Sequence, residues 1–192
     1  MEAIWLSTLI VAIAEIGDKT QLLAIVLACK FNKPIPIIAG IFVATIINHA
    51  LAASLGFGVA QLISGKWFQV GVGVAFIAMA AWALIPDKED EDAGAKSHGS
   101  VFMTTVIAFF LVEMGDKTQI ATSLLAARFE NITLVTIGTT FGMMLANVPA
   151  VYLGQAATKV VPLNVVRMIA AGIFAAIGVW VVVAALTATQ PT

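Results

Sequence analysis

The stretch AIAEIGDKTQLLAIVLA (residues 12–28) is apolar at both ends and carries Glu15, Asp18 and Lys19 in its middle. A transmembrane helix needs about 20 mostly apolar residues, and the flanks of this stretch have that character. A charge at mid-membrane costs at least ~2.5 kcal/mol, so such residues normally face a protein interior or a water-filled cavity. The stretch therefore predicts a membrane span with a functional polar site inside it.

The composition supports a membrane protein. The chain has 192 residues, of which 60% are hydrophobic and 11% charged, and its mean hydropathy is +1.01. Soluble domains carry roughly 25% charged residues, so a soluble fold of this size could not bury so much apolar surface. We expect an integral membrane protein in contact with a lipid bilayer. A net charge of −1 gives no basic surface for nucleic acid, and a single cysteine and two histidines exclude an intramolecular disulfide and a zinc framework.

Six apolar runs follow one another along the chain. Backbone polar groups in lipid must be satisfied within their own segment, so we predict six transmembrane helices. A β-barrel would need alternating polar and apolar residues, which these runs lack. The runs are Ala3–Cys29, Ile35–Ile63, Trp67–Ile85, Val101–Ala127, Ile132–Ala157 and Val165–Ala188. The first run has no positive leader and no clear cleavage site, so we expect it to be the first span of the mature protein.

The chain repeats itself. A shift of 98 residues places Glu15 on Glu113 and the block GDKTQ (17–21) on the identical block at 115–119. We therefore expect two homologous three-helix halves, 1–86 and 101–192, joined by an acidic linker at 87–100. An odd number of spans turns the second half upside down, which gives an inverted repeat of the kind found in secondary transporters.

The linker and the basic residues bear on orientation. The linker is either a flexible solvated segment or an acidic loop that collects cations near a pore mouth, and its composition fits both. Lysines and arginines are more numerous on the linker's side of the membrane, so the positive-inside rule places the linker in the cytoplasm and both termini outside. That side holds Lys30, Lys33, Lys88, Lys96, Lys159 and Arg167, whereas the other side holds Lys66 and Arg128.

The charged residues suggest a cation site. Glu15 and Asp18 are three residues apart, so they would share one face of a helix, and Glu113 and Asp116 would do the same. Further oxygen ligands would come from Thr20, Gln21, Thr118 and Gln119. Four carboxylates with Lys19 and Lys117 leave a charge of −2, which one divalent cation or two protons would neutralise. Oxygen ligands suit Ca²⁺, Mn²⁺ and Mg²⁺ rather than Cu(I) or Zn²⁺.

Two blander interpretations stay open for these polar residues. The pairs Glu15–Lys19 and Glu113–Lys117 could be intrahelical ion pairs that only stabilise the bundle, although the recurrence of the whole block argues against this. Asn48, His49 and Asn147 could form interhelical hydrogen bonds, or they could lie beside the cation site, where His49 would relay protons.

The two motifs EIGDKT (15–20) and EMGDKT (113–118) match the pattern Glu-x-Gly-Asp-(Lys/Arg)-(Thr/Ser). With both copies, the chain resembles, over nearly its whole length, the Ca²⁺/Mn²⁺–proton exchanger family of membrane proteins. The resemblance implies a transporter rather than an enzyme, with no cofactor besides the transported ions.

The same resemblance implies roles for the motif residues. Glu15, Asp18, Glu113 and Asp116 would form the cation and proton site, and Glu15 and Glu113 would carry protons and metal alternately. Lys19 and Lys117 would balance charge and favour the ionised carboxylates. The resemblance also implies that bacterial members export manganese, and the compact chain fits a member in a bacterial plasma membrane.

The runner-up function is a divalent cation channel on the same helices, without proton coupling. A membrane enzyme is a more distant alternative, since Ser7, Cys29 and His49 show no catalytic grouping. The residues leave open the choice of Mn²⁺ or Ca²⁺, the proton stoichiometry and whether the chain forms a homo-oligomer.

Overall fold

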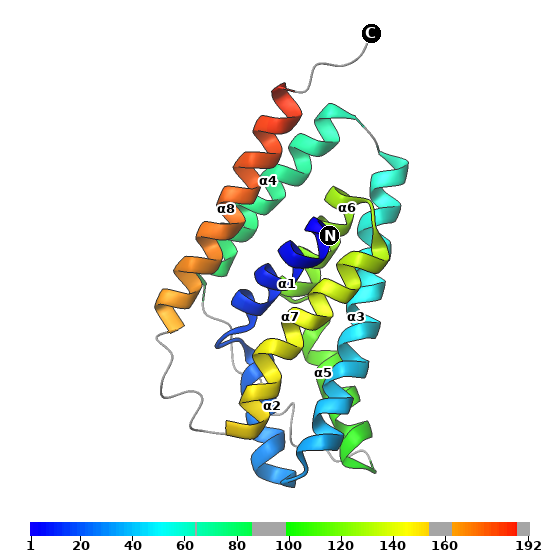
Figure 1. The fold of residues 1–192 in the computed structure, drawn as a ribbon, viewed down its shortest axis with the longest axis vertical. Helices are drawn as coiled ribbons and strands as arrows, with labels where there is room; N and C mark the ends of the chain where they lie inside the picture. The colour runs from blue at the N-terminus through cyan, green and yellow to red at the C-terminus, as the bar shows by residue number, and fades with distance from the viewer. Residues whose placement is uncertain (64, 86–98, 154–162, 188–192) are drawn as a thin grey trace.

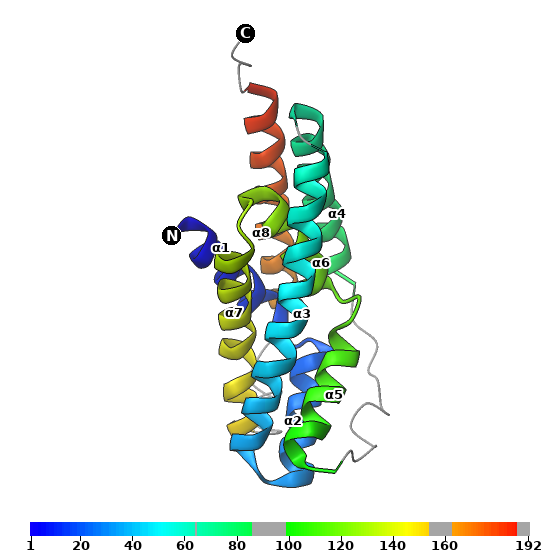
Figure 2. The ribbon, with the colours of Figure 1, turned by 90° about the vertical axis from the view of Figure 1, so that its right-hand side faces the viewer.

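A computed structural model of the protein describes residues 1–63, 65–85, 99–153 and 163–187. Within these residues the regular structure is helical, in an elongated bundle (Figure 1, Figure 2). The helices are α1 (Glu2–Glu15), α2 (Lys19–Phe31), α3 (Pro34–Leu62), α4 (Lys66–Ala83), α5 (Val101–Glu113), α6 (Lys117–Phe129), α7 (Ile132–Leu153) and α8 (Leu163–Thr187). The predicted helical fold is confirmed. Most of the acidic linker, together with Lys88, Lys96 and Lys159, lies outside the described residues.

The first and fourth apolar runs each form two helices rather than the single helix we predicted. Gly17 and Gly115 separate the two pieces and have φ angles of +78° and +79°. Glycine adopts this left-handed conformation readily because it has no Cβ, so the helix is interrupted inside each motif. The prediction that Glu15 and Asp18 share one helix face is therefore wrong, because Glu15 ends α1 and Asp18 is the N-cap of α2. It is wrong for Glu113 and Asp116 for the same reason, because Glu113 ends α5 and Asp116 is the N-cap of α6.

Four helical segments are individually long and apolar enough to cross a membrane: α3, α4, α7 and Arg167–Thr187 of α8. The pieces α1, α2, α5 and α6 have 13 or 14 residues each. At 1.5 Å per residue such a piece is about 20 Å long, shorter than the roughly 30 Å hydrocarbon core. Figures 1 and 2 show that α1 and α2 follow one another along the long axis, and that α5 and α6 do so in the opposite direction.

Reciprocal contacts join the two halves of the chain. A Cβ on Gly40 of α3 would lie 2.7 Å from Cβ of Thr105 on α5, and a Cβ on Gly138 of α7 would lie 2.6 Å from the backbone oxygen of Ile4 on α1. The Gly138 position also faces Ser7, which precedes Thr105 by the repeat offset of 98 residues. The missing side chains allow these helices to approach closely, in the manner of small-residue contacts in membrane bundles.

Other contacts hold the remaining helices. A Cβ on Gly56 of α3 would overlap the backbone oxygen of Ser123 on α6, and the Ser123 hydroxyl donates a hydrogen bond to Ala52 O at 2.9 Å. Phe76 of α4 stacks on Phe174 of α8 with ring centroids 6.4 Å apart, and these two helices lie side by side in both views (Figure 1, Figure 2). The packing of α3 on α6 and of α1 on α7 leaves Glu15, Glu113 and Asp116, which flank the two helix breaks, buried inside the bundle.

Candidate metal site

Three carboxylates from the two helix breaks meet inside the bundle. One oxygen from each of Glu15, Glu113 and Asp116 lies within 4.8 Å of the other two. The three residues are at most 3% exposed. Ligand atoms of one cation bound at about 2.1–2.5 Å can be no more than about 5 Å apart, so this cluster has the size of a cation site. We call these three residues the carboxylate cluster.

Threonines of the motifs hold one oxygen of each glutamate. Thr20 donates a hydrogen bond to Glu15 Oε2, and Thr118 donates to Glu113 Oε1 and, at 3.4 Å, to Asp116 Oδ2. Glu15 Oε1 and Glu113 Oε2 are buried and have no hydrogen-bond partner among the described residues. A buried carboxylate oxygen without a partner is costly, so each glutamate offers one bare oxygen to a proton or a cation.

The glutamines of the motifs hold the helix breaks. Gln21 Oε1 accepts a hydrogen bond from the Gly17 backbone N–H at 2.8 Å, and Gln119 Oε1 accepts from Gly115 N–H at 2.6 Å. Gln21 Nε2 also donates to Ala146 O at 3.1 Å, which ties the first break to α7. Both amide oxygens therefore point to the glycines that interrupt the helices, and the carboxylates and threonine hydroxyls form the centre of the site.

Lys19 pairs across the two halves of the chain. Its Nζ lies 2.9 Å from Asp116 Oδ1. Lys19 therefore forms an ion pair with the second motif and not the intrahelical pair with Glu15 that was considered from the sequence. Lys117, its counterpart in the second motif, donates a hydrogen bond to Ile85 O at 2.8 Å, at the end of α4. With every group ionised, the carboxylate cluster and Lys19 together carry a charge of −2.

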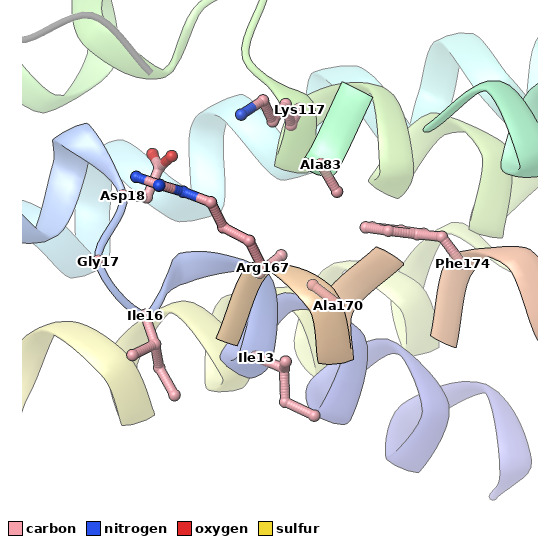
Figure 3. A pocket seen from close by; sticks show the side chains of 10 residues that line it. Ile13, Ile16, Gly17, Asp18, Ala83, Lys117, Arg167, Ala170 and Phe174 are labelled. Atoms are coloured by element: carbon pink, nitrogen blue, oxygen red, sulfur yellow. The ribbon is translucent and has the colours of Figure 1, made fainter. Parts of the chain in front are cut away.

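Asp18 is not part of the carboxylate cluster. It lines a small neighbouring pocket together with Lys117 and Arg167, and Figure 3 shows the Arg167 side chain pointing toward Asp18. The sequence predicts that four carboxylates converge on one cation, and three of them, those of the carboxylate cluster, lie close enough together to bind it. From the sequence, Arg167 was used only to orient the chain in the membrane. Its position at the start of an apolar run was the one sequence signal that could have placed Arg167 near the cation site.

The polar residues of α3 and α7 have different environments. Asn48 Nδ2 donates to Phe110 O of α5 at 3.2 Å, which is an interhelical hydrogen bond. The side chain of His49 is fully buried, and its Nε2 lies 3.6 Å from Glu113 Oε1. Asn147 Nδ2 donates to Met143 O of its own helix at 3.0 Å. Of these three residues, His49 therefore lies against the carboxylate cluster.

Comparison with known proteins yields one family and several relatives. The chain matches the family described as "Divalent cation/proton antiporter GDT1" twice, over residues 3–91 and 101–189. A Vibrio cholerae protein named "Putative manganese exporter" is 50% identical over 178 residues, which cover 91% of this chain and 87% of that protein. No solved structure matches the chain.

Plant relatives are more distant. "GDT1-like protein 4" of Arabidopsis thaliana is 25% identical over 207 residues, which cover 87% of this chain and 89% of that protein. "GDT1-like protein 3" of Oryza sativa subsp. indica is 28% identical over 167 residues, which cover 73% of this chain and 59% of that protein. The two family matches begin 98 residues apart, which is the offset between the EIGDKT and EMGDKT motifs.

Proposed function

The chain belongs to the GDT1 family of divalent cation/proton antiporters, and from this premise we propose that it exchanges Mn²⁺ or Ca²⁺ for protons at the carboxylate cluster. The observation that carries the proposal is the convergence of Glu15, Glu113 and Asp116, from two motifs a hundred residues apart, on one ion-sized space. Ions of this class take carboxylate and hydroxyl oxygens as ligands.

The charge of the site supports exchange rather than simple binding. The cluster and Lys19 carry −2 when ionised, so one divalent cation or two protons would make the site neutral. An empty, fully charged site in a membrane interior is unfavourable. The protein therefore changes its exposed side with one of the two loads in place, at a ratio of one metal ion to two protons. Glu15 and Glu113, each with a bare oxygen, are the groups that take up the protons.

We further propose that the broken segments cross the membrane as units. The α1–α2 and α5–α6 pieces together with α3, α4, α7 and α8 then give six crossings in two inverted repeats, 1–86 and 101–192. The opposite directions of the two broken segments support this arrangement (Figure 1, Figure 2), as do the reciprocal glycine contacts of Gly40 and Gly138. Discontinuous spans around a central ion site are a recurrent transporter architecture.

Manganese export is the direction we propose. The Vibrio cholerae relative, 50% identical over most of both chains, bears the name of a manganese exporter. Export from a bacterium places the protein in the plasma membrane, with the acidic linker in the cytoplasm and both termini outside, as the positive-inside rule predicts.

Flux in proteoliposomes tests the proposal. An acid-inside proton gradient is imposed, Mn²⁺ or Ca²⁺ is supplied outside, and metal content and internal pH are followed together. We expect metal uptake coupled to proton exit, and loss of both in Glu15→Gln and Glu113→Gln. Glu2→Gln, which removes an exposed carboxylate at the start of α1, serves as the matched control and keeps activity. Metal uptake that ignores the proton gradient would instead identify a cation channel.

A further inference from the structure

The imidazole of His49 lies beside the carboxylate cluster with both of its nitrogens unused. The side chain is fully buried in α3, its Nε2 lies 3.6 Å from Glu113 Oε1, and neither Nδ1 nor Nε2 has a hydrogen-bond partner among the described residues. Buried polar atoms nearly always have partners. Glu113 Oε1 already accepts a hydrogen bond from Thr118, whereas Glu113 Oε2 has no partner among the described residues. Two unpartnered imidazole nitrogens beside a carboxylate that has one unpartnered oxygen point to a ligand that would engage both side chains.

The packing of α3 on α5 sets the position of this imidazole. Gly40 lets the two helices approach at Thr105 and Phe102, and Asn48 Nδ2 bonds Phe110 O about two turns further along α3. His49 directly follows Asn48, and Glu113 lies three residues after Phe110 on α5. Two fixed contacts on the same helix pair therefore place the imidazole opposite Glu113.

We propose that His49 Nε2 is a ligand of the transported cation and that it makes the site prefer divalent first-row transition-metal ions, Mn²⁺ among them, over Ca²⁺ and Mg²⁺. Two ligand atoms bound to one ion at about 2.2 Å lie ~3.1 Å apart at a right angle and ~3.6 Å apart at the tetrahedral angle. The observed distance between His49 Nε2 and Glu113 Oε1 is 3.6 Å. The imidazole is not within 4.8 Å of all three carboxylates of the cluster, so it would move toward Glu15 and Asp116 when the ion binds. This inference rests on the proposed function and names the ion class that the function left open.

The chemical basis is the choice of donor atom. Ca²⁺ and Mg²⁺ are bound almost entirely by oxygen, whereas neutral imidazole is a common ligand of transition-metal ions. An all-carboxylate site would not separate Mn²⁺ from Ca²⁺ by donor type. One nitrogen among the oxygens adds a contact that only the transition-metal ion uses well, and it predicts that Co²⁺, which lies above Mn²⁺ in the affinity series for such ligands, competes strongly with Mn²⁺.

The second half of the chain supplies a natural comparison. The residue 98 positions after His49 is Asn147, an amide. The nitrogen ligand is therefore contributed by one half alone, and the site is chemically asymmetric although the motifs are nearly identical. The substitution His49→Asn puts the residue of the second half at the position of the first, as a smaller side chain without the imidazole nitrogens.

Competition in proteoliposomes tests the selectivity. Uptake of Mn²⁺ is measured against increasing Ca²⁺, Mg²⁺ or Co²⁺ for the wild type, His49→Asn and His98→Asn, the last of which removes the chain's other histidine. We expect the preference for Mn²⁺ over Ca²⁺ to fall at least tenfold in His49→Asn and to stay unchanged in His98→Asn. An unchanged preference in a His49→Asn protein that still transports would overturn the proposal.

Pulsed EPR gives a second readout that does not depend on the His49 variant folding. His98→Asn is produced with ¹⁵N-labelled histidine and loaded with Mn²⁺, so that a nitrogen coupling of a directly bound imidazole can come only from His49. Such a coupling supports the proposal, and its absence overturns it. A wild type that moves neither ion against protons would instead refute the proposed function itself, so the two failures are distinguishable.

Discussion

The ion pair between the two halves allows a charge-rescue prediction. In wild type the carboxylate cluster and Lys19 carry −2, and a bound divalent ion brings the total to zero. Asp116→Asn leaves the Lys19 ammonium, 2.9 Å from the former carboxylate, without its charge partner, and the loaded site becomes +1. Lys19→Met alone leaves the loaded site at −1. The double variant Lys19→Met/Asp116→Asn returns the loaded site to zero.

The magnitude follows from the distance. Two unit charges at 2.9 Å attract by about 6 kcal/mol at an effective dielectric constant of 20. Breaking a buried pair costs about 3–5 kcal/mol, and the side chain of Lys19 is 20% exposed, so we take the lower end, about 3 kcal/mol. This energy is a loss of stability in the metal-free and the metal-loaded protein alike. Metal binding weakens because Asp116→Asn also removes one negative charge that attracts the ion, and a unit charge and a +2 ion about 5 Å apart interact by about 6–7 kcal/mol at the same dielectric constant. Half of this value weakens metal binding by a factor of about a hundred or more, and the double variant, which also removes the repelling charge of Lys19, should recover at least tenfold of that loss.

The assay is concentration-dependent Mn²⁺ uptake in proteoliposomes for the wild type, both single variants and the double variant. Asp18→Asn is the matched control, because Asp18 is the equivalent aspartate of the other motif and lies outside the carboxylate cluster. We expect it to affect uptake less than Asp116→Asn does. The reasoning is refuted if Asp116→Asn transports like the wild type, or if the double variant is no better than the worse of the two single variants.

Two further predictions concern stability. Gly115→Ala should lower the free energy of unfolding by about 1–2 kcal/mol, because alanine is strained at the φ of +79°. Nothing within 4 Å would clash with the added Cβ, so the backbone strain is the whole effect. Thermal unfolding in detergent measures the change, and the control Gly58→Ala, in a helix with open space around the residue, should be neutral or stabilising. Mn²⁺ at about 100 times its Kd should stabilise the wild type by about 2.7 kcal/mol and raise its unfolding temperature, with a much smaller effect in Glu113→Gln; equal shifts in the two proteins would contradict metal binding at the cluster.

The sequence by itself determined the environment and the residues of interest. Continuous apolar runs can satisfy their backbone in lipid only as helices, so the helical membrane fold could be predicted from composition and run length. Charges inside such runs are costly enough that a repeated block of them marks a functional site. The motif residues Glu15, Glu113 and Asp116 could be named for this reason without any knowledge of how the helices pack.

The tertiary structure decided how those residues are arranged. Spacing along a chain predicts a shared face only if the helix is continuous, and the left-handed glycines at 17 and 115 interrupt it. Asp18 and Asp116 both follow such a break as N-caps, and only the packing of the helices places Asp116, but not Asp18, in the carboxylate cluster. Contacts such as Lys19 with Asp116 and His49 with Glu113 link residues 64 or more positions apart. They depend on where helices cross, and the crossing points are set by close approaches at glycines such as Gly40 and Gly138, which local sequence patterns do not encode.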